Sequence, residues 1–574
     1  MLRLLREIYG EEVGRETLGR IEALMAAYRG RLPQGQAAAL SAQDAILITY
    51  ADQVQEGERP FLPALTDFCQ AHLQGAVSAV HLLPFYPYSS DDGFSVIDYR
   101  QVRPDLGTWA DVARLGRRFR LMFDAVINHI SAQSAWVQGF LRDEPEYRDY
   151  FTVVEPGADL SAVFRPRAHP LLTRVETAVG PKHVWTTFSP DQIDLNYRNP
   201  DVLLEVLETL LFYVSQGAEF IRLDAIAFMW KEPGTRCLHL PQTHQIIQVM
   251  RALLDKVAPH VILITETNVP HEENISYFGD GRNEAQMVYN FSLPPLTLHT
   301  FHQGDAGALS RWAAGLRLPG PRTTFFNFLA SHDGIGVTPA RNILSEAEIE
   351  ALVERVKALG GHVSYRTQPG KVTAPYELNI NYLDALGAPG FTEEVELAAR
   401  RFMAAQAIML ALRGVPGIYF HSLFGSRGWP DGAAQLGYNR AINRQKLARA
   451  DLERELADPL SLRYQVFQRY RHLLRVRGQT AAFDPAAEQQ VLFLNPALFC
   501  LLRAAENGRE SVLCLHNVTN QPQSVALDLR PLDLTAPLWD MAAVEMVGEG
   551  SGRYLSLTLD PYQVRWLQPA SEIR

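Results

Sequence analysis

The chain has 574 residues, more than one ordinary domain, and its 47% hydrophobic and 21% charged residues are typical of a globular protein with several cores. The net charge of -10 argues against a general nucleic-acid binder or a protein of anionic membranes, because such binding depends on Lys and Arg. The four cysteines have no metal-binding spacing and are too few to cross-link so long a chain, so we expect reduced thiols in the core.

The first 43 residues predict a helical extension ahead of the first strand. Apolar residues recur at helical spacing from Glu16 to Arg29. Arg and Glu interrupt the apolar residues of positions 1–31, and no later run is long enough to span a membrane. We therefore expect neither a signal peptide nor a membrane span, and the cytoplasm is the expected location.

Eight short apolar runs follow, and helical stretches separate several of them. The runs cover residues 46–50, 77–85, 121–127, 220–226, 261–264, 287–291, 325–329 and 415–420, and the helical stretches cover residues 200–215, 244–257 and 394–412. Continuous apolar strands that alternate with helices are typical of a parallel sheet buried on both faces. Eight such strands predict a closed (β/α)8 TIM barrel of the α/β class, which we place in residues 44–129 and 200–484.

Two long irregular segments interrupt this barrel, and a different pattern ends the chain. Residues 130–199 follow the third strand and residues 334–386 follow the seventh. Insertions at the C-terminal ends of barrel strands usually form the walls of an active site. Residues 485–574 alternate short apolar runs with turns rich in Asn, Gly and Pro, which predicts a C-terminal antiparallel β domain.

Acidic residues stand at the ends of four of the predicted strands: Asp124, Asp224, Glu266 and Asp333. One such residue is more often a loop cap than a nucleophile, but four at one edge of a barrel predict groups that converge on one pocket. Arg222 projects on the same side of its strand as Asp224, and its charge should lower the pKa of that carboxyl group, as suits a nucleophile.

Glu266 ends an aliphatic strand, where partial burial should raise its pKa and let it hold a proton as a general acid. One ionised and one protonated carboxyl group, roughly 5 Å apart, are what a retaining glycosidase requires. Asp333, beside His332, would then bind sugar hydroxyls. The alternative is that each of these residues has only a structural role.

These segments resemble the four signature regions of the α-amylase superfamily of glycoside hydrolases, namely Asp124–His129, Arg222–Asp224, Glu266 and Ser331–Asp333. The resemblance covers about residues 44–480, and it implies a (β/α)8 barrel. It implies Asp224 as nucleophile, Glu266 as general acid/base and Asp333 as transition-state stabiliser. It also implies a glucose subsite lined by Asn128, His129, Arg222 and His332.

Within that superfamily the chain is most similar to the sucrose phosphorylase group, through segments such as Asp91–Phe94, Phe164–Arg167, Trp185–Pro190 and Asn439–Arg444. This resemblance implies that Asp91 and Arg440 are a pair that grips the far hydroxyls of glucose. It implies that Phe94 and Phe188 are aromatic walls; either one alone is more often a core residue. The resemblance adds Gln192, Tyr376 and Glu377 to the substrate-binding residues.

A phosphorylase also requires an anion site, because phosphate must replace water as the second acceptor. The candidates for binding phosphate or the acceptor are Arg167 in the first insertion and His362, Arg366 and Lys371 in the second. Basic groups bind oxyanions, and a mobile loop could exchange one acceptor for another. The alternative interpretation is that each is a solvated loop charge.

The resemblance implies a retaining α-glucoside phosphorylase that releases α-D-glucose 1-phosphate by double displacement, with no metal and no organic cofactor. The segment Thr373–Asn379 keeps Tyr376 but departs from true sucrose phosphorylases, and the basic loops suit an anionic acceptor. The expected substrate is therefore 2-O-α-glucosylglycerate.

Several alternatives stay open at this point. They are a glucosylglycerol, sucrose 6'-phosphate or sucrose phosphorylase, then a hydrolase or transglucosidase, and last a non-catalytic amylase-like scaffold. The expected partners are a small sugar substrate and inorganic phosphate, with no nucleic acid and no membrane. Both a monomer and a homodimer are consistent with the sequence.

Overall fold

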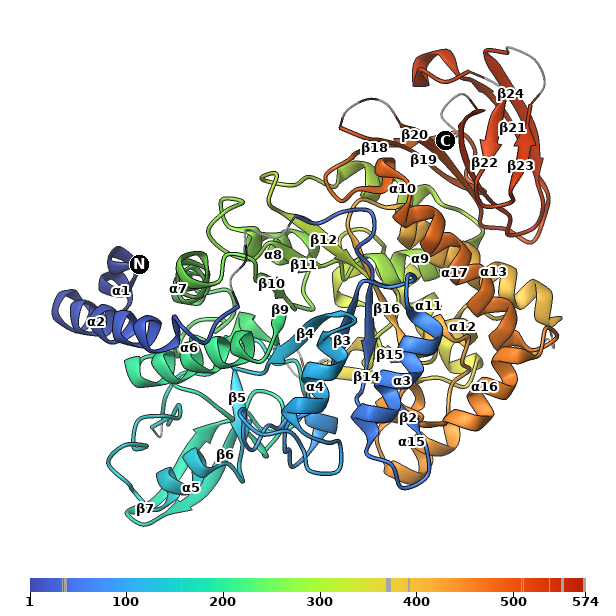
Figure 1. Ribbon diagram of the computed structural model, residues 1–574. Helices are drawn as coiled ribbons and strands as arrows, with labels where there is room; N and C mark the ends of the chain where they lie inside the picture. The colour runs from blue at the N-terminus through green and yellow to red at the C-terminus, as the bar shows by residue number, and fades with distance from the viewer. Residues whose placement is uncertain are drawn as a thin grey trace.

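A closed barrel of eight parallel strands forms the centre of the molecule (Figure 1). The computed structural model describes residues 1–33, 35, 39–155, 157–367, 373–390, 393–506, 508, 510–535, 537–548 and 552–570. The barrel strands are β1 (Ile46–Thr49), β3 (Ala79–Leu82), β4 (Arg120–Ala125), β9 (Ala218–Leu223), β10 (Ile262–Thr265), β11 (Met287–Tyr289), β12 (Thr324–Asn327) and β16 (Val415–Tyr419). The barrel closes where β16 pairs with β1, with Gly417 opposite Ile46.

Burial on both faces explains why these strands are continuous apolar runs. Side chains fill the barrel on one side and meet the surrounding helices on the other. The helices around the barrel are α3 (Phe61–Leu73), α4 (Trp109–Gly116), α6 (Pro200–Ser215), α7 (Pro241–Val257), α9 (Leu293–Gln303), α10 (Gly307–Gly315), α13 (Val395–Ala411), α16 (Arg449–Ala457) and α17 (Leu462–Gly478). The sequence-based prediction of a (β/α)8 barrel is confirmed, and each predicted strand overlaps one barrel strand.

Local sequence determines where the helices begin. The Asn199 side chain accepts a hydrogen bond from the backbone N–H of Asp201, and Pro200 takes the first turn of α6, where its missing N–H costs nothing. Thr108 and Asp111 form a capping box at the start of α4. These signals explain why the start of α6 agrees with the sequence.

The first insertion follows β4. It contains β5 (His129–Ser131), α5 (Ala135–Leu141), the hairpin of β6 (Leu172–Thr177) and β7 (Gly180–Trp185), and β8 (Gln192–Asp194). β8 returns antiparallel to β5, with Asp194 opposite His129. The chain therefore comes back to the mouth of the barrel before α6 begins.

The second insertion follows β12. It contains β13 (Ile335–Gly336), a short 3-10 helix, η4 (Thr338–Ala340), then α11 (Glu346–Ala358), β14 (His362–Thr367), β15 (Thr373–Asn379) and α12 (Tyr382–Ala385). The three strands form a sheet in the order β13-β15-β14. Both insertions follow the C-terminal ends of parallel strands, so they lie at the same end of the barrel.

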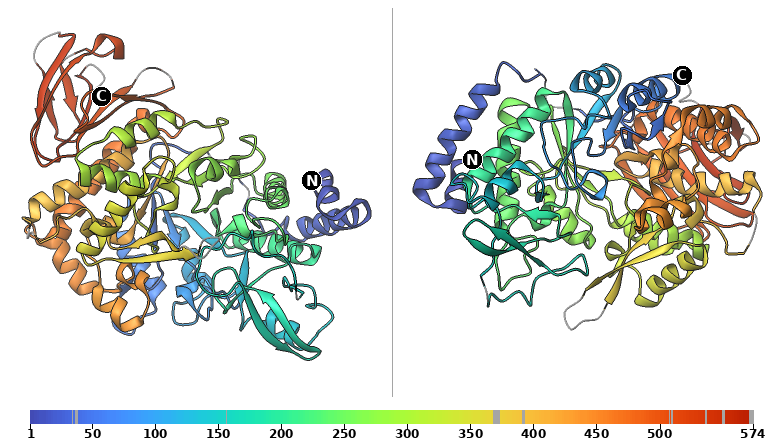
Figure 2. Two further views of the ribbon diagram at one scale, coloured as in Figure 1. Left: turned by 180° about the vertical axis from the view of Figure 1, so that it is seen from behind. Right: turned by 90° about the horizontal axis from the view of Figure 1, so that it is seen from below.

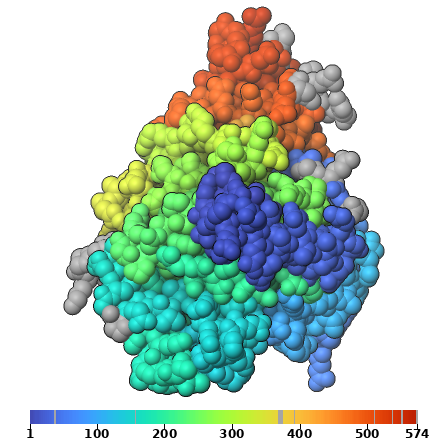
Figure 3. All heavy atoms as spheres, turned by 90° about the vertical axis from the view of Figure 1, so that its left-hand side faces the viewer, coloured from blue at the N-terminus to red at the C-terminus, as the bar shows by residue number. Residues whose placement is uncertain are grey.

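The N-terminal helices α1 (Leu2–Tyr9) and α2 (Glu11–Tyr28) form a hairpin on the outside of the barrel, where α1 contacts α7 and α2 contacts α6. Figure 3 shows this hairpin lying across the surface. No helix in the described part of the chain is long and apolar enough to cross a bilayer. The four cysteines are buried and free, as expected.

An antiparallel β domain ends the chain, as predicted. One sheet contains, in spatial order, β18 (Glu488–Leu492), β19 (Leu498–Ala504), β20 (Ser511–Asn517), β25 (Val564–Pro569), β22 (Leu538–Asp540) and β23 (Glu545–Val547), and β21 (Gln523–Asp528) pairs with β24 (Tyr554–Leu559). A cluster that includes Leu513, Leu515 and Leu555 forms a core of its own. This domain and the β6–β7 hairpin lie at opposite ends of the molecule (Figure 2).

Two buried arginines bind main-chain oxygens near the junction of the barrel and the C-terminal domain, and of the two it is Arg503 that connects these two parts. Arg477 of α17 donates hydrogen bonds to the carbonyl oxygens of Asp44 (3.1 Å) and Gly414 (2.9 Å), among others. Arg503 of β19 donates to the carbonyl oxygens of Ala411 and Asp484, each at 2.8 Å. We propose domain limits at residues 1–43, 44–129 with 200–484, 130–199, 334–386 and 485–574.

Candidate active site

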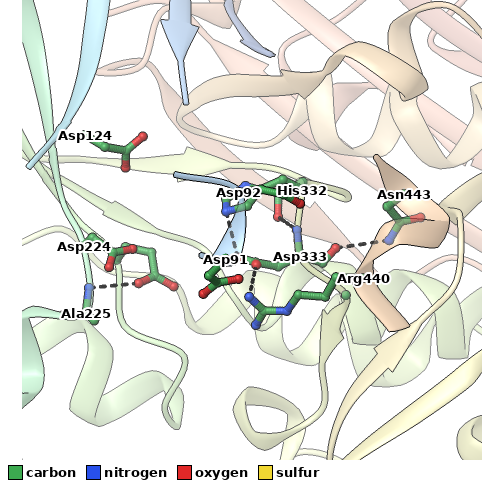
Figure 4. Close-up of polar contacts among 12 residues, drawn as sticks. Asp91, Asp92, Asp124, Asp224, Ala225, His332, Asp333, Arg440 and Asn443 are labelled. Atoms are coloured by element: carbon green, nitrogen blue, oxygen red, sulfur yellow. Dashed lines mark hydrogen bonds and ion pairs between the residues drawn. The ribbon is translucent and has the colours of Figure 1, made fainter. Parts of the chain in front are cut away.

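The three predicted catalytic carboxyl groups line one cavity at the open end of the barrel. Asp224 follows β9, Glu266 follows β10, and Asp333 lies in the loop after β12. Parallel strands deliver their C-terminal residues to the same end of a barrel, which is why residues more than 100 positions apart meet here. Figure 4 shows Asp224 on one side of this region and Asp333 with its partners on the other.

Arg222 is the centre of charge under the cavity. Its Nη1 donates to Asp224 Oδ1 at 2.8 Å and also contacts Asp124 Oδ1, and its Nη2 lies 3.7 Å from Glu266 Oε2. The side chain is only 2% exposed. One guanidinium therefore serves three carboxyl groups.

Asp124 does not line the cavity, so the prediction that four acidic groups converge on one pocket is wrong for this residue. It lies inside β4 and not beyond its end, is fully buried, and accepts a hydrogen bond from His81 Nε2 at 2.7 Å. Figure 4 shows its carboxyl group apart from the others. Burial opposes ionisation of Asp124, but Arg222 and His81 outweigh it and lower its pKa. Asp124 therefore holds Arg222 in place from below.

Burial raises the pKa of Asp224 to about 7; Arg222 opposes the rise, while Asp124 and Asp333 add to it. The prediction that Arg222 lowers the pKa of Asp224 below its ordinary value is therefore wrong. The sequence shows the neighbouring guanidinium, but it shows neither the loss of water around Asp224 nor the second carboxylate, Asp124, that shares this guanidinium.

Burial also raises the pKa of Glu266 to about 7, with Arg222 opposing and Asp224 adding to the rise, and this direction agrees with the prediction. The negative charge of Asp224 disfavours a second negative charge on Glu266, so a protonated Glu266 beside an ionised Asp224 is favoured near neutral pH. Arg222 lies closer to Asp224 (2.8 Å) than to Glu266 (3.7 Å), which favours the charge on Asp224. The backbone N–H of Ala225 donates to Glu266 Oε2 at 3.2 Å and orients its carboxyl group.

Asp333 is held as an anion. Arg440 Nη1 lies 2.6 Å from Asp333 Oδ1, and His332 Nε2 lies 3.4 Å from Oδ2. Burial opposes ionisation, but the charges of Arg440 and Arg444 outweigh it and lower the pKa of Asp333 far below its usual range. Burial lowers the pKa of His332 well below its ordinary value, so its ring is neutral, and it stacks on Phe94 with the ring centroids 4.8 Å apart.

Ten of the predicted substrate-binding residues line the same cavity. These are Asp91, Phe94, His129, Phe188, Gln192, Arg222, His332, Tyr376, Glu377 and Arg440. Tyr376 and Glu377 come from β15, so the second insertion supplies part of the wall.

One detail of the predicted glucose subsite differs from the structure. Asn128 lies behind the cavity, where its amide donates to Asp194 (3.1 Å) and accepts from Lys231 (2.9 Å). Asp91 and Arg440 both line the cavity, and their joint contact with glucose stays a prediction. Arg440 pairs there with Asp333 and Glu377, and Asp91 lies 3.9 Å from Arg444.

Of the three basic candidates within the described residues, only Arg167 lines the cavity. Arg167 lines the cavity, with its Cζ 5.7 Å from the ring centroid of Tyr376. Arg366 lies over the ring of Phe164 at 5.3 Å and does not line the cavity, and His362 is exposed at the start of β14. Lys371 lies outside the described residues.

The sequence analysis missed Arg444 and Asp92 as site residues. Both fall in segments that carried the resemblance, and Arg444 Nη1 lies 2.6 Å from Asp92 Oδ2. Their spacing in sequence, 352 positions, gave no signal that they meet.

Comparisons with known proteins agree with this geometry. Residues 73–313 match the family model for the α-amylase catalytic domain, and residues 500–567 match that for the C-terminal immunoglobulin-like domain of D-apionate lactonase. A glucosylglycerate phosphorylase from Spirochaeta thermophila is 50% identical, covering 99% of this chain and 98% of the relative. Another, from Escherichia coli K12, is 44% identical, covering 98% and 99%.

A solved structure with the same fold is that of sucrose 6F-phosphate phosphorylase from Thermoanaerobacter thermosaccharolyticum. It aligns with a TM-score of 0.74 at 21% identity, covering 91% of this chain and 99% of that chain. The chain therefore belongs to the sucrose phosphorylase group of the α-amylase superfamily, the group that includes these relatives.

Proposed function

We propose that this protein is a retaining phosphorylase that converts 2-O-α-D-glucosylglycerate and phosphate into α-D-glucose 1-phosphate and glycerate. The observation that carries the proposal is the geometry of two carboxyl groups, Asp224 and Glu266, that line one cavity and lie 2.8 and 3.7 Å from the guanidinium of Arg222. The two glucosylglycerate phosphorylases at 50% and 44% identity support the choice of substrate.

The first step is attack of Asp224 on the anomeric carbon. Arg222 occupies Oδ1, so Oδ2 is the attacking oxygen. The bond from the anomeric carbon to the glycerate oxygen breaks, and Glu266 donates its proton to that oxygen. The product of this step is a glucosyl-enzyme with inverted configuration, and glycerate leaves.

The second step reverses the roles. A phosphate oxygen attacks the anomeric carbon, its proton passes to Glu266, and the bond to Asp224 breaks. Two inversions restore the α configuration. Asp333, an anion held by Arg440, stabilises the positive charge that develops on the sugar in both transition states.

We assign glucose binding to the residues that line the cavity, apart from Asp224, Glu266, Asp333 and Arg167. Phe94 stacked on His332 gives the sugar ring an apolar wall, while Asp91, Gln192 and Glu377 offer polar groups to its hydroxyls. These steps use side chains and phosphate alone, so we propose no cofactor.

We propose that Arg167, together with Arg366 and the arginines near it, makes the acceptor side of the cavity positive in a chain of net charge -10. Arg167 lines the cavity. Burial lowers the pKa of Arg366, and the nearby charges of Arg341 and Arg236 lower it further. Their carboxylate partners are few: Arg341 pairs with the exposed Glu346, and Arg236 lies 3.5 Å from Glu273. A positive potential here favours phosphate and glycerate, both anions, over neutral acceptors.

Arg167 is our candidate for direct contact with the anion. Among the basic candidates in the described part of the chain, it is the one that lines the cavity. Arg366, over Phe164, would attract the anion without touching it. His362 is exposed at the start of β14, and we assign it no contact.

Product analysis tests the proposal. The protein is incubated with 2-O-α-glucosylglycerate with and without phosphate, and the products are followed by NMR. We expect α-D-glucose 1-phosphate only when phosphate is present. Free glucose formed at equal rates in both incubations would reject phosphorolysis. In the reverse direction, α-D-glucose 1-phosphate is offered with glycerate, glycerol, fructose or fructose 6-phosphate, and a preference for any acceptor other than glycerate would reject the assigned substrate.

A further inference from the structure

A strained turn lies at the glucose side of the cavity, in the loop after β3. Asp91 and Asp92 both have left-handed backbone conformations, with φ of 52° and 48°, and Gly93 follows at 111°. Consecutive non-glycine residues in this region are unfavourable and persist only when surrounding contacts hold them. A Cβ at Gly93 would lie 2.6 Å from the Pro84 carbonyl oxygen, so the turn also requires its glycine.

The contacts that hold the turn converge on Asp92. Arg444 Nη1 lies 2.6 Å from Asp92 Oδ2, and the Tyr438 hydroxyl donates to the same oxygen at 2.6 Å. The guanidinium also lies 3.9 Å from Asp91 Oδ1. Arg444 is buried, with a side chain that is 2% exposed, whereas Asp92 is 31% exposed.

The other edge of the same guanidinium reaches the loop after β12. Arg444 Nε donates to the carbonyl oxygen of His332 at 2.8 Å, and Nη2 lies 3.6 Å from Asp333 Oδ1. Figure 4 shows Asp91, Asp92, His332 and Asp333 gathered in one small region. A planar guanidinium has a fixed fork of donors, so contacts on both edges fix the distance between the two loops.

We propose that Arg444, with Asp92 as its counter-ion, is a positioning residue for the glucose subsite. It fixes the turn that carries Asp91 relative to His332 and Asp333, so that the glucose side of the cavity is formed before substrate binds. Arg444 does not line the cavity and acts through these three residues. The proposal rests on one part of the proposed function, namely that the protein binds a glucosyl donor.

A double-mutant cycle tests the proposal, with Asp92→Asn, Arg444→Lys and the combined variant. Asn tolerates the left-handed backbone but removes the charge, and Lys keeps the charge but removes the fork. Two reactions are measured: hydrolysis of α-D-glucosyl fluoride, and transfer from α-D-glucose 1-phosphate to glycerate. Since small misplacements of substrate are costly, each single variant should lose between about 10-fold and 100-fold in kcat/KM for both donors.

Two further expectations separate positioning from a general loss of structure. The combined variant should lose no more than the worse single variant, because the two residues act as one unit. The KM for glycerate should stay within about twofold, because the acceptor side is built by other residues. Arg427→Lys is the matched control. Arg427 lies in the same segment between β16 and α16 as Arg444, pairs with Asp384 at 2.6 Å and does not line the cavity, so the activity of this variant should equal that of the parent.

Three results would each overturn the proposal. They are an unchanged kcat/KM for the glucosyl donors, additive losses in the combined variant, and a raised KM for glycerate without a loss in kcat/KM for the donors. If Arg444→Lys does not fold, Asp92→Asn and Tyr438→Phe carry the test, because each weakens the hold on the same turn from a partly exposed position. Failure of the proposed function has a different result. The parent would then form no phosphate-dependent product, while the glucosyl fluoride comparison would still decide the role of Arg444.

Discussion

At the scale of single residues, the charge on one side chain is determined by contacts that the sequence does not display. Arg222 and Asp224 are two positions apart, and this proximity alone predicts a lowered pKa. The folded chain adds Asp124 from β4 and removes water, and the pKa of Asp224 rises to about 7. The same burial acts on Glu266 as predicted, because a run of aliphatic residues before it already indicated an apolar setting.

Replacement of the nucleophile is the most direct test at this scale. We expect Asp224→Ala to lower kcat by roughly 10⁴-fold or more, because no other group in the described cavity is placed to form the glucosyl-enzyme. The fold should persist, since Asp124 still pairs with Arg222. Steady-state kinetics and circular dichroism check both statements. A variant that keeps the parent rate would remove Asp224 from the mechanism.

Glu266 also makes stability depend on pH. Its pKa is about 7 in the folded chain and near 4.5 when unfolded, so the folded state keeps a proton that the unfolded state releases. The stabilising contribution of this proton is present in full below pH 4.5 and is lost as pH rises through about 7. Glu266→Gln should therefore raise the free energy of unfolding relative to the parent by on the order of 2 kcal/mol at pH 8, and by little at pH 4.

Urea unfolding at the two pH values measures this difference. Glu272→Gln is the control, because Glu272 is exposed and its variant should match the parent at both values. An equal effect of Glu266→Gln at pH 4 and pH 8 would contradict the raised pKa.

At the scale of elements, close packing inside the barrel limits what the strands can contain. A Cβ at Gly417 of β16 would lie 2.2 Å from Phe326 Cζ of β12, inside a filled barrel. We expect Gly417→Ala to lower the free energy of unfolding by about 1–3 kcal/mol through overpacking. Thermal and urea unfolding measure the loss.

Gly19→Ala in α2 is the matched control. Its Cβ would meet nothing within 4 Å, and it lies in an exposed helix, where alanine is favoured over glycine by about 1 kcal/mol. The same substitution should therefore stabilise one element and destabilise the other. Two changes of the same sign would show that packing against Phe326 does not decide the effect.

The elements themselves were accessible from sequence because the barrel strands are continuous apolar runs. Strand ends were less accessible: Asp124 lies within β4, level with Arg222 of β9, and therefore below the level of Asp224 and the cavity. The fold places Arg444 between residues 92 and 332, and no local pattern encodes such a meeting. Residues next to strand ends could be predicted as site residues, whereas those that act through distant loops could not.

At the scale of the whole molecule, Arg477 links three regions of the chain through main-chain oxygens. Its guanidinium donates to main-chain oxygens that include those of Asp44, Leu410 and Gly414. Arg477→Met keeps the length of the side chain but leaves these buried oxygens unsatisfied. We expect a loss of roughly 3 kcal/mol or more in the free energy of unfolding.

The neighbouring Arg475→Met is the control, because Arg475 is exposed in the last turn of the same helix. Its effect should stay within about 0.5 kcal/mol. Calorimetry of both variants decides the matter, and equal melting temperatures would contradict the role given to Arg477.

The acceptors of Arg477 and Arg503 are main-chain oxygens, and every amino acid supplies one. The residues that present these oxygens, such as Ala411 and Asp484, can therefore vary in side chain as long as the backbone follows the same path. Exchange of the C-terminal domain between relatives would therefore require the guanidinium of Arg503 and the apolar contacts of residues such as Phe499 and Trp566, but not particular side chains at the positions that accept from Arg503.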